Sequence, residues 1–167
     1  MTLATSGRDG EVTARIVLLK KYGPEGFTFF TNYASRKGAQ LSENPRAALV
    51  FHWPYLLRQV RIEGTIERVS REESEAYFHS RPRLYQLAAS ASKQSQVLAS
   101  RKVLIAEFKR LRESLEGHDV PLPATWGGYR LVPRSMEFWR HRDNRLHDRR
   151  RYRRTDGGEW TSEYLSP

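Results

Sequence analysis

The alternation of hydrophobic and polar positions predicts that residues 1–69 fold as β-strands. Apolar or β-branched runs occupy Thr2–Thr5, Val12–Lys21, Phe27–Thr31, Arg46–Trp53 and Leu57–Val69. Segments that contain glycine or proline separate the first runs from one another and mark turns. We therefore expect consecutive hairpins in this part of the chain.

A short helix is expected among these strands, and longer helices in the middle of the chain. Ser35–Asn44 predicts the short helix, with the hydroxyl of Ser35 as its N-cap. Ser70 opens a second helix in the manner of a capping box, and Pro82 ends it. Val103–Leu111 places its apolar side chains on one stripe, which predicts an amphipathic surface helix.

The last quarter of the chain returns to strand patterns, at Gly128–Arg140, Arg149–Arg154 and Trp160–Leu165. Strands, then helices, then strands that complete the sheet predict a mainly β protein of the α+β class, an antiparallel β-barrel with helices packed at its ends. No repeat, low-complexity tract or linker divides the sequence. We therefore expect a single domain over residues 1–167.

The composition restricts the class of protein. The 167 residues include no cysteine, which excludes disulfides, thiolate metal sites and a cysteine nucleophile. The five histidines lack close metal-ligand spacing, so we expect no metal. No apolar run is long enough to span a membrane and no signal-peptide pattern opens the chain, so we expect a cytoplasmic protein without membrane contact. The formal net charge of +10 predicts attraction to phosphates.

This positive charge is densest at residues 140–154, which contain eight Arg and two Asp directly after an aromatic strand end. If this segment continues as a strand, Arg145, His147 and Arg149 share one face. A histidine between fixed cations suits the binding of an anionic substrate, and an ordinary exposed histidine is the simpler alternative.

Two other groups of cations are candidates for phosphate contacts. Arg36 and Lys37 stand at the start of the predicted short helix, where free backbone N–H groups also point outward. The alternative is a solvated surface pair. Arg15 and Lys20 bracket an aliphatic run and would point to opposite faces of a strand.

Residue types and spacing leave two classes of function open. One is an enzyme whose cofactor carries both an aromatic ring system and a phosphate. The other is a nucleic-acid binder that stacks bases on Trp139 and Tyr152 within the arginine-rich segment. Charge and spacing alone do not separate the two.

A set of ordered motifs resembles one known family. They are Arg15-Ile-Val-Leu-Leu-Lys20, Phe30-Thr31-Asn32-Tyr33, Ser35-Arg36-Lys37, Arg58-Gln59-Val60, Tyr77-Phe78-His79-Ser80-Arg81-Pro82-Arg83, Ser92-Lys93-Gln94-Ser95, Trp126-Gly127-Gly128-Tyr129, Glu137-Phe138-Trp139 and Arg145-Leu146-His147-Asp148-Arg149. Through these motifs essentially the whole chain resembles the pyridoxamine (pyridoxine) 5′-phosphate oxidase family. The resemblance implies an FMN-binding split β-barrel that forms a homodimer, with FMN at the subunit interface.

The resemblance also implies the site residues. FMN would be held by Arg15, Ile16, Val17, Leu18, Leu19, Lys20, Phe30, Thr31, Arg36, Lys37, Gln59, Gln94, Ser95, Trp139 and Arg149, with Arg36 and Lys37 on its phosphate. The substrate phosphate would be bound by Lys20, Tyr77 and Arg81, with Tyr85 at the last phosphate position. Arg145 and His147 match the catalytic pair that orients the pyridine ring over the flavin.

The implied reaction transfers a hydride from the exocyclic C4′ carbon of pyridoxamine or pyridoxine 5′-phosphate to FMN. Molecular oxygen then reoxidises the flavin and gives H₂O₂. The alcohol yields pyridoxal 5′-phosphate directly, and the amine yields an imine that water hydrolyses to the same aldehyde with release of ammonia. The flavin supplies the redox chemistry and the protein supplies placement and charge. On this interpretation we do not expect a nucleic-acid partner.

Several positions depart from the family pattern, mainly on the substrate side. They are Leu84-Tyr85, Ala88-Ala89-Ser90, Arg140-His141 and the tail Tyr164-Leu165-Ser166-Pro167. The family's usual N-terminal helical segment is also expected to be absent. These departures keep an alternative open, a flavin oxidase of secondary metabolism, as in phenazine biosynthesis, that acts on another aromatic substrate.

Overall fold

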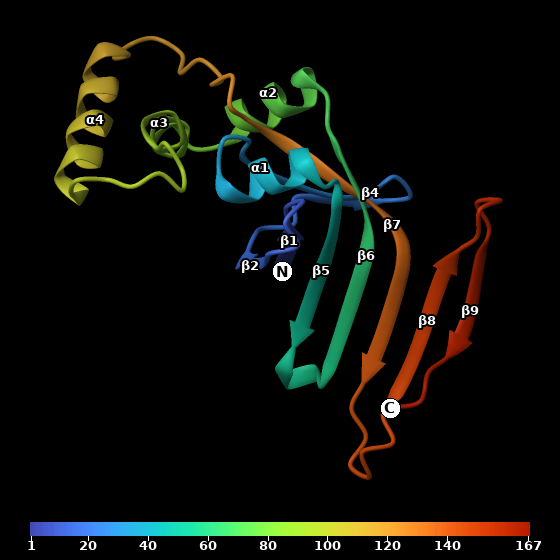
Figure 1. Cartoon of the computed structure of the whole chain (residues 1–167). Helices are drawn as coiled ribbons and strands as arrows, with labels where there is room; N and C mark the ends of the chain where they lie inside the picture. Colours follow the sequence, from blue (N-terminus) through green and yellow to red (C-terminus); the bar gives the residue numbers. More distant parts are fainter. The chain divides into compact units, whose positions relative to one another are not determined.

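The computed structural model describes residues 1–167 and contains four α-helices and a nine-stranded sheet (Figure 1). The strands are β1 (Thr2–Ser6), β2 (Val12–Ile16), β3 (Lys21–Gly23), β4 (Gly26–Asn32), β5 (Arg46–Trp53), β6 (Arg58–Arg68), β7 (Trp126–Arg140), β8 (Asp148–Arg154) and β9 (Trp160–Tyr164). The helices are α1 (Arg36–Glu43), α2 (Arg71–Ser80), α3 (Arg83–Ala91) and α4 (Arg101–Ser114), with a short 3₁₀ turn at Pro54–Leu56. None of the helices is both long and apolar enough to cross a membrane.

The chain forms two compact units, which are described separately. The strand unit comprises Met1–Phe29, Gln40–Glu67 and Arg130–Pro167. The helical unit comprises Phe30–Ala39 and Arg68–Tyr129. The expectation of a single domain stays a prediction.

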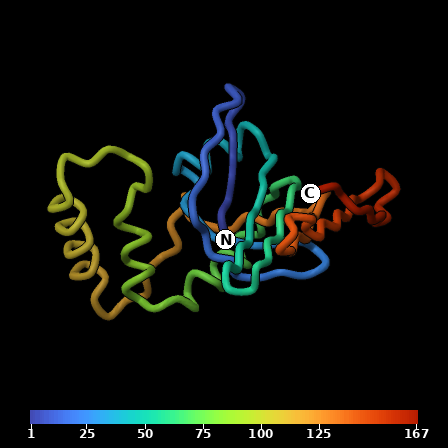
Figure 2. Tube along the Cα trace, turned by 90° about the horizontal axis from the view of Figure 1, so that it is seen from below, coloured from blue at the N-terminus to red at the C-terminus, as the bar shows by residue number.

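The sheet is that of an open, split barrel, as predicted. Seven of its strands follow the order β2-β1-β5-β6-β7-β4-β3, so β2 and β3 are the edges of this path. Strand β8 pairs with β7 outside this path and with β9. The length of β7 allows this branching, because its last part, Ser135–Arg140, pairs antiparallel with β8. The β8–β9 hairpin ends the chain (Figure 2).

Local sequence signals set several of these boundaries. The hydroxyl of Ser35 accepts a hydrogen bond from the N–H of Gly38 (3.3 Å), and that of Ser70 accepts one from the N–H of Glu73 (3.0 Å). Both are N-cap contacts that satisfy N–H groups left free in the first helical turn, so both predicted caps are confirmed.

Two expectations about secondary structure are wrong. The run Val12–Lys21 is not one strand, because β2 ends at Ile16 and β3 begins at Lys21. Between them, the N–H of Val17 donates to the carbonyl of Met1 (2.9 Å), outside the ladder of β2 with β1. In addition, α3 forms in a segment for which we predicted no helix.

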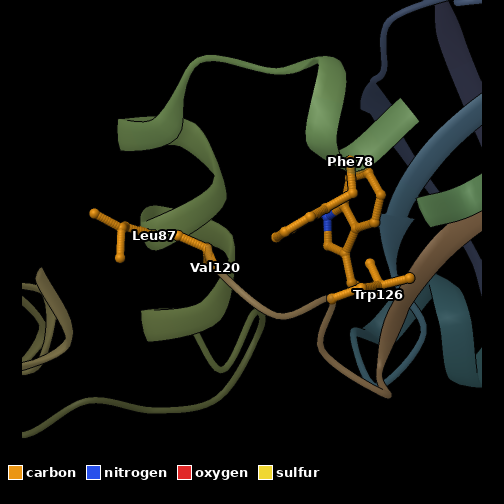
Figure 3. Close-up of a cluster of buried hydrophobic side chains, with 5 residues drawn as sticks. Phe78, Leu87, Val120 and Trp126 are labelled. Atoms are coloured by element: carbon orange, nitrogen blue, oxygen red, sulfur yellow. The ribbon is translucent and has the colours of Figure 1, made fainter. Parts of the chain in front are cut away.

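Each unit has its own apolar core. In the strand unit, Leu3, Leu49 and Ile62 come from β1, β5 and β6 and are at most 1% exposed. In the helical unit, Phe78, Leu87, Val120, Leu122 and Trp126 form a buried cluster (Figure 3). Burial of apolar surface is the main favourable contribution to folding, so these clusters fix the elements that carry the candidate site.

Candidate functional site

Three predicted cofactor residues meet around one buried ammonium group in the helical unit. Nζ of Lys37 donates to Oγ1 of Thr31 (3.1 Å) and to Oε1 of Gln94 (2.9 Å), and Thr31 also donates to Gln94 (3.1 Å). The hydroxyl of Ser35, which no motif had assigned to the site, lies 3.2 Å from the same nitrogen. Lys37 is only 8% exposed, so a cation is held at a fixed place by oxygen acceptors.

The neighbouring candidates are more open to solvent. Arg36 is exposed at the first position of α1, while Lys37 beside it is buried. Ser95 is exposed and has a φ angle of 72°, in the left-handed region that non-glycine residues seldom adopt. Such backbone strain persists where surrounding structure imposes it, often at ligand sites.

The predicted cofactor segment at residues 15–20 belongs to the strand unit. Arg15 bonds to the hydroxyl of Thr5 (2.6 Å), the carbonyl of Leu3 (3.2 Å) and the hydroxyl of Thr13, which fixes its guanidinium against β1 and β2. Beyond it, Ile16 and Leu18 are 73% and 65% exposed. Val17, Leu19 and Lys20 complete the segment, and the N–H of Lys20 donates to the carbonyl of Thr28 (2.9 Å). Apolar side chains so exposed are typical of a surface that binds a partner or a ligand.

Aromatic rings from three parts of the helical unit form a stack that includes two predicted site residues. The rings of Phe30 and Tyr77 lie 4.1 Å apart at 25°, and those of Phe30 and Trp126 lie 5.5 Å apart at 13°. Gly128 makes room for this stack, because an added Cβ would come within 2.8 Å of the Phe30 ring. The stack gives Tyr77 and Phe30 fixed positions.

The guanidinium of Arg81 lies against this stack. Its central carbon is 4.9 Å from the centroid of the Trp126 ring, and its Nη2 donates to the main-chain carbonyl of Tyr85 (3.1 Å). Its Nη1 is buried without any hydrogen-bond partner. Burial lowers the pKa of Arg81, and the nearby Tyr77 opposes this effect. The side chain of Tyr85 is 61% exposed and contributes no contact of its own to Arg81.

A second part of the predicted site lies in the strand unit. Gln59 on β6 and Trp139 on β7 both line a cavity of about 660 Å³. The remainder of the lining is mostly aromatic, aliphatic and basic, with Trp53, Phe138 and Arg150 among it, and Asp148 adds one carboxylate. A cavity of this size with apolar walls and a few polar groups suits a flat aromatic ligand.

Arg149 is paired with a buried carboxylate in the strand unit. Its Nε and Nη2 donate to the two oxygens of Glu137 at 2.8 and 3.2 Å, and Arg61 lies 3.5 Å from the same carboxylate. The bond from Arg149 is the main cause that lowers the pKa of Glu137, whose side chain is only about 5% exposed. Glu137 holds the Arg149 side chain in place, and the sequence did not single it out, although it opens a family motif.

The predicted strip of Arg145, His147 and Arg149 on one strand face is wrong. β8 begins only at Asp148, so residues 141–147 form a loop. The N–H of Leu146 bonds to the side chain of Asn144 (3.0 Å), and Arg145 has a left-handed φ of 62°. Asparagine in this position makes a local turn that competes with a strand.

The loop nevertheless gives His147 a defined surrounding. Its Nδ1 accepts the N–H of Arg142 (3.1 Å), so the neutral imidazole carries its proton on Nε2. Its ring lies 4.8 Å from that of Trp139 and 5.0 Å from that of His141. His141 is one of the positions that we expected to depart from the family pattern, and the fold brings it next to His147.

Comparisons with known proteins identify the family to which the chain belongs. Residues 1–114 match the family described as pyridoxamine 5′-phosphate oxidase, and residues 126–167 match the pyridoxine 5′-phosphate oxidase C-terminal dimerisation region. The chain is 53% identical over 167 residues to the pyridoxine/pyridoxamine 5′-phosphate oxidase of Gloeothece citriformis, covering 100% of this chain and 78% of the relative. It is 55% identical over 169 residues to the enzyme of the same name from Salinibacter ruber, covering 100% of this chain and 79% of the relative.

A solved structure gives the same result for the fold. The crystal structure of PhzG from Burkholderia lata 383, in complex with tetrahydrophenazine-1-carboxylic acid, superimposes with a TM-score of 0.93 at 33% sequence identity. The match covers 99% of this chain and 81% of the PhzG chain. The resemblance inferred from the sequence is therefore confirmed, and the chain belongs to the pyridoxamine 5′-phosphate oxidase family.

Proposed function

We propose that the protein oxidises pyridoxamine or pyridoxine 5′-phosphate to pyridoxal 5′-phosphate, with FMN as cofactor and O₂ as final acceptor. Family membership supports the coarser part of this statement, an FMN-dependent oxidoreductase. The observation that carries the substrate class is Arg81, a half-buried guanidinium that lies against the Trp126 ring, near Tyr77, and whose Nη1 has no hydrogen-bond partner. A donor of this kind favours an anionic oxygen such as that of a phosphate ester.

The residues present suit FMN in their chemistry. The Lys37 ammonium, with Thr31 and Gln94 around it, offers a cation and polar groups for the phosphate of the cofactor. Gln59 and Trp139 line an apolar cavity that would take part of the flat ring system. When bound, FMN supplies the capacity to accept a hydride from C4′ and to be reoxidised by O₂ with release of H₂O₂.

The chain's own residues bind and orient the substrate. Arg81 offers an N–H to its phosphate, and Tyr77, fixed in the aromatic stack, offers a phenol next to that cation. His147, as a neutral imidazole with Nε2–H, donates a hydrogen bond to the pyridine ring's substituents, and Arg145 adds positive charge on the same loop. Lys20 is proposed as a further phosphate contact.

We also propose that the protein is a homodimer. Support comes from residues 126–167, which match a dimerisation region. In the strand unit the same stretch exposes large apolar side chains, with Phe138 45% and Tyr164 80% exposed, and Trp53 on β5 is 43% exposed. Light scattering coupled to gel filtration should give about twice the monomer mass of 19.5 kDa; a monomer in solution would refute the dimer.

A second candidate is oxidation of a tricyclic aromatic acid, as the ligand of the PhzG structure suggests for that protein. In its favour, Tyr164 belongs to a departure from the family pattern and lines the cavity with Trp139. We rank it second because Arg81 and Tyr77 retain donors suited to a phosphate.

Oxygen consumption by FMN-loaded protein separates the two candidates. We expect turnover with pyridoxine 5′-phosphate and pyridoxamine 5′-phosphate, stoichiometric H₂O₂, and little turnover with unphosphorylated pyridoxine or with a dihydrophenazine carboxylic acid. Turnover confined to the tricyclic acid would replace the first proposal by the second. Tyr85→Ser provides a further comparison, and because the phenol is largely exposed we expect it to change the rate little.

A further inference from the structure

Arg81 combines a charge, burial and an unmet hydrogen-bond donor in the helical unit. Its Nη1 has no partner, although buried polar atoms in proteins are nearly always paired. Burial also lowers the pKa of its guanidinium. Holding a cation in such surroundings is unfavourable unless other groups compensate, so the contacts that fix Arg81 identify the residues on which its role depends.

The main chain of Arg81 is fixed by an amide side chain. Nε2 of Gln86 donates to the carbonyl of Arg81 (2.8 Å) and to that of His79 (3.3 Å), which α2 leaves free at its C-terminal end. Gln86 itself is only 8% exposed. The point from which the Arg81 side chain departs therefore has little freedom to move.

The guanidinium is fixed by an aromatic face and by one hydrogen bond. The centroid of the Trp126 ring is 4.9 Å from its central carbon, and that of Phe78 is 5.8 Å away. Its Nη2 is engaged by the carbonyl of Tyr85 (3.1 Å). Contact with a ring face compensates a buried cation without using any of its N–H groups. The ring therefore supports the charge of Arg81, although Nη1 has no hydrogen-bond partner in the chain.

Trp126 is itself held from several sides. Its ring stacks on those of Phe30 (5.5 Å) and Tyr77 (6.2 Å) and meets Phe78 edge-on (5.1 Å), within the cluster drawn in Figure 3. It is 7% exposed. A ring so constrained can act as a rigid support for the group that lies on it.

We propose that Trp126 is a positioning residue for anion binding, because its ring face holds the Arg81 guanidinium in the place from which it binds the substrate phosphate. This inference rests on the proposed function, in which Arg81 contacts that phosphate. It assigns a role to a residue that is otherwise part of the hydrophobic core. If Trp126 were only a core residue, its loss would reduce stability and leave the preference for phosphate intact.

The test is a double-mutant cycle on the FMN-loaded protein, with pyridoxine 5′-phosphate and unphosphorylated pyridoxine as ligands. Trp126→Leu and Arg81→Ala are made singly and together, and dissociation constants are measured by equilibrium dialysis alongside KM and kcat. We expect Trp126→Leu to raise the dissociation constant of pyridoxine 5′-phosphate about 10-fold and to leave that of pyridoxine almost unchanged. Adding Arg81→Ala to Trp126→Leu should then raise this dissociation constant by less than about 2-fold, because the two substitutions remove the same interaction.

Two variants separate positioning from stability. Val120→Ala removes volume from the same core cluster, so it should lower the melting temperature and leave the phosphate preference unchanged. Trp126→Phe keeps a ring and a folded core, and should give an intermediate loss of about 3-fold for the phosphorylated ligand. Should Trp126→Leu not fold, this variant carries the test.

The outcomes divide clearly. The inference would be overturned if the two single losses of affinity multiplied in the double variant. It would also be overturned if Trp126→Phe and Val120→Ala lowered the affinity for the phosphorylated ligand equally. Absence of any phosphate preference in the unaltered protein would overturn it as well. A phosphorylated ligand that binds through this pair and is not oxidised would instead reject the proposed reaction and leave the positioning role standing.

Discussion

Glu137 is the carboxylate whose loss should be most costly to the strand unit. It is about 5% exposed on β7, with Arg149 at 2.8 Å and Arg61 at 3.5 Å. Glu137→Gln preserves the shape of the side chain and one oxygen acceptor while it removes the negative charge. The substitution therefore tests whether the ion pair stabilises the fold.

The expected loss in the free energy of unfolding depends on how exposed Glu137 and its arginine partners are. Removing one partner of a fully buried pair costs about 3–5 kcal/mol, because the other charge stays buried. Here the side chains of Arg149 and Arg61 are 25% and 44% exposed, so water solvates part of the freed charge. What remains is a hydrogen bond to a charged group, and we expect about 2 kcal/mol in the free energy of unfolding.

The neighbouring β8–β9 hairpin offers a matched control. Glu163 pairs with Arg151 at 2.7 Å between β8 and β9, but the carboxylate side chain is 49% exposed. Exposed pairs contribute roughly 0–1 kcal/mol, so Glu163→Gln should cost much less than Glu137→Gln. Urea unfolding, followed by tryptophan fluorescence at pH 7, measures both.

The pH dependence gives a second check. The bond from Arg149 lowers the pKa of Glu137 from its ordinary value of 4.5, so the carboxylate is ionised in the folded protein at neutral pH. A lowered folded-state pKa contributes stability above the ordinary value, and this stability is lost as the pH falls through the folded-state pKa. The difference between the unaltered protein and Glu137→Gln should therefore shrink below pH 4.5. Equal losses in the two variants at pH 7, or a difference that persists in acid, would refute the reasoning.

Three further substitutions test other parts of the structure. Ser70→Ala removes the cap bond to the N–H of Glu73 and should cost about 1 kcal/mol in urea unfolding, while Ser100→Ala, at a cap without a side-chain bond, should cost clearly less; similar losses would contradict the capping role. Lys37→Met should raise the FMN dissociation constant about 10-fold or more, and unchanged FMN retention would remove Lys37 from the cofactor site. His147→Ala should lower kcat by on the order of 100-fold with FMN still bound, whereas loss of FMN would mean a structural role.

Elements defined by local sequence signals were predictable. The limits of β5 coincide with the predicted Arg46–Trp53, and the helix N-caps at Ser35 and Ser70 form as expected. The apolar pattern of a strand, or a hydroxyl that bonds an N–H three residues on, depends only on neighbouring residues. Strand patterns and helix caps therefore form largely independently of contacts with the rest of the chain.

Helix α3 shows where the local signals were missed. The sequence predicts that Pro82 ends a helix, and in the structure Pro82 is also the N-cap of α3, Arg83–Ala91. Proline suits a helix start because its N–H is not needed there. The buried Leu87 and Ala91, four residues apart, repeat at helical spacing and could have revealed the helix.

The residues that form the candidate site come together only through the fold. Lys37 and Gln94 are 57 positions apart, and no periodicity connects them. Trp126 supports Arg81 from another part of the chain. The family resemblance placed Lys37, Gln94 and Arg81 among the site residues. It gave no reason to single out Trp126, because a tryptophan in a sequence is usually assigned to the hydrophobic core.

The departures from the family pattern are of two kinds once their contacts are known. Tyr85 meets Arg81 through its main-chain carbonyl, which any residue provides, and its phenol is 61% exposed. The change at that position therefore leaves the contact to the phosphate-binding cation intact. His141, by contrast, places a ring 5.0 Å from that of His147 and alters the surroundings of a side chain proposed to orient the substrate. We therefore expect the change at Tyr85 to spare binding of a phosphate by Arg81, and the change at His141 to affect the proposed role of His147.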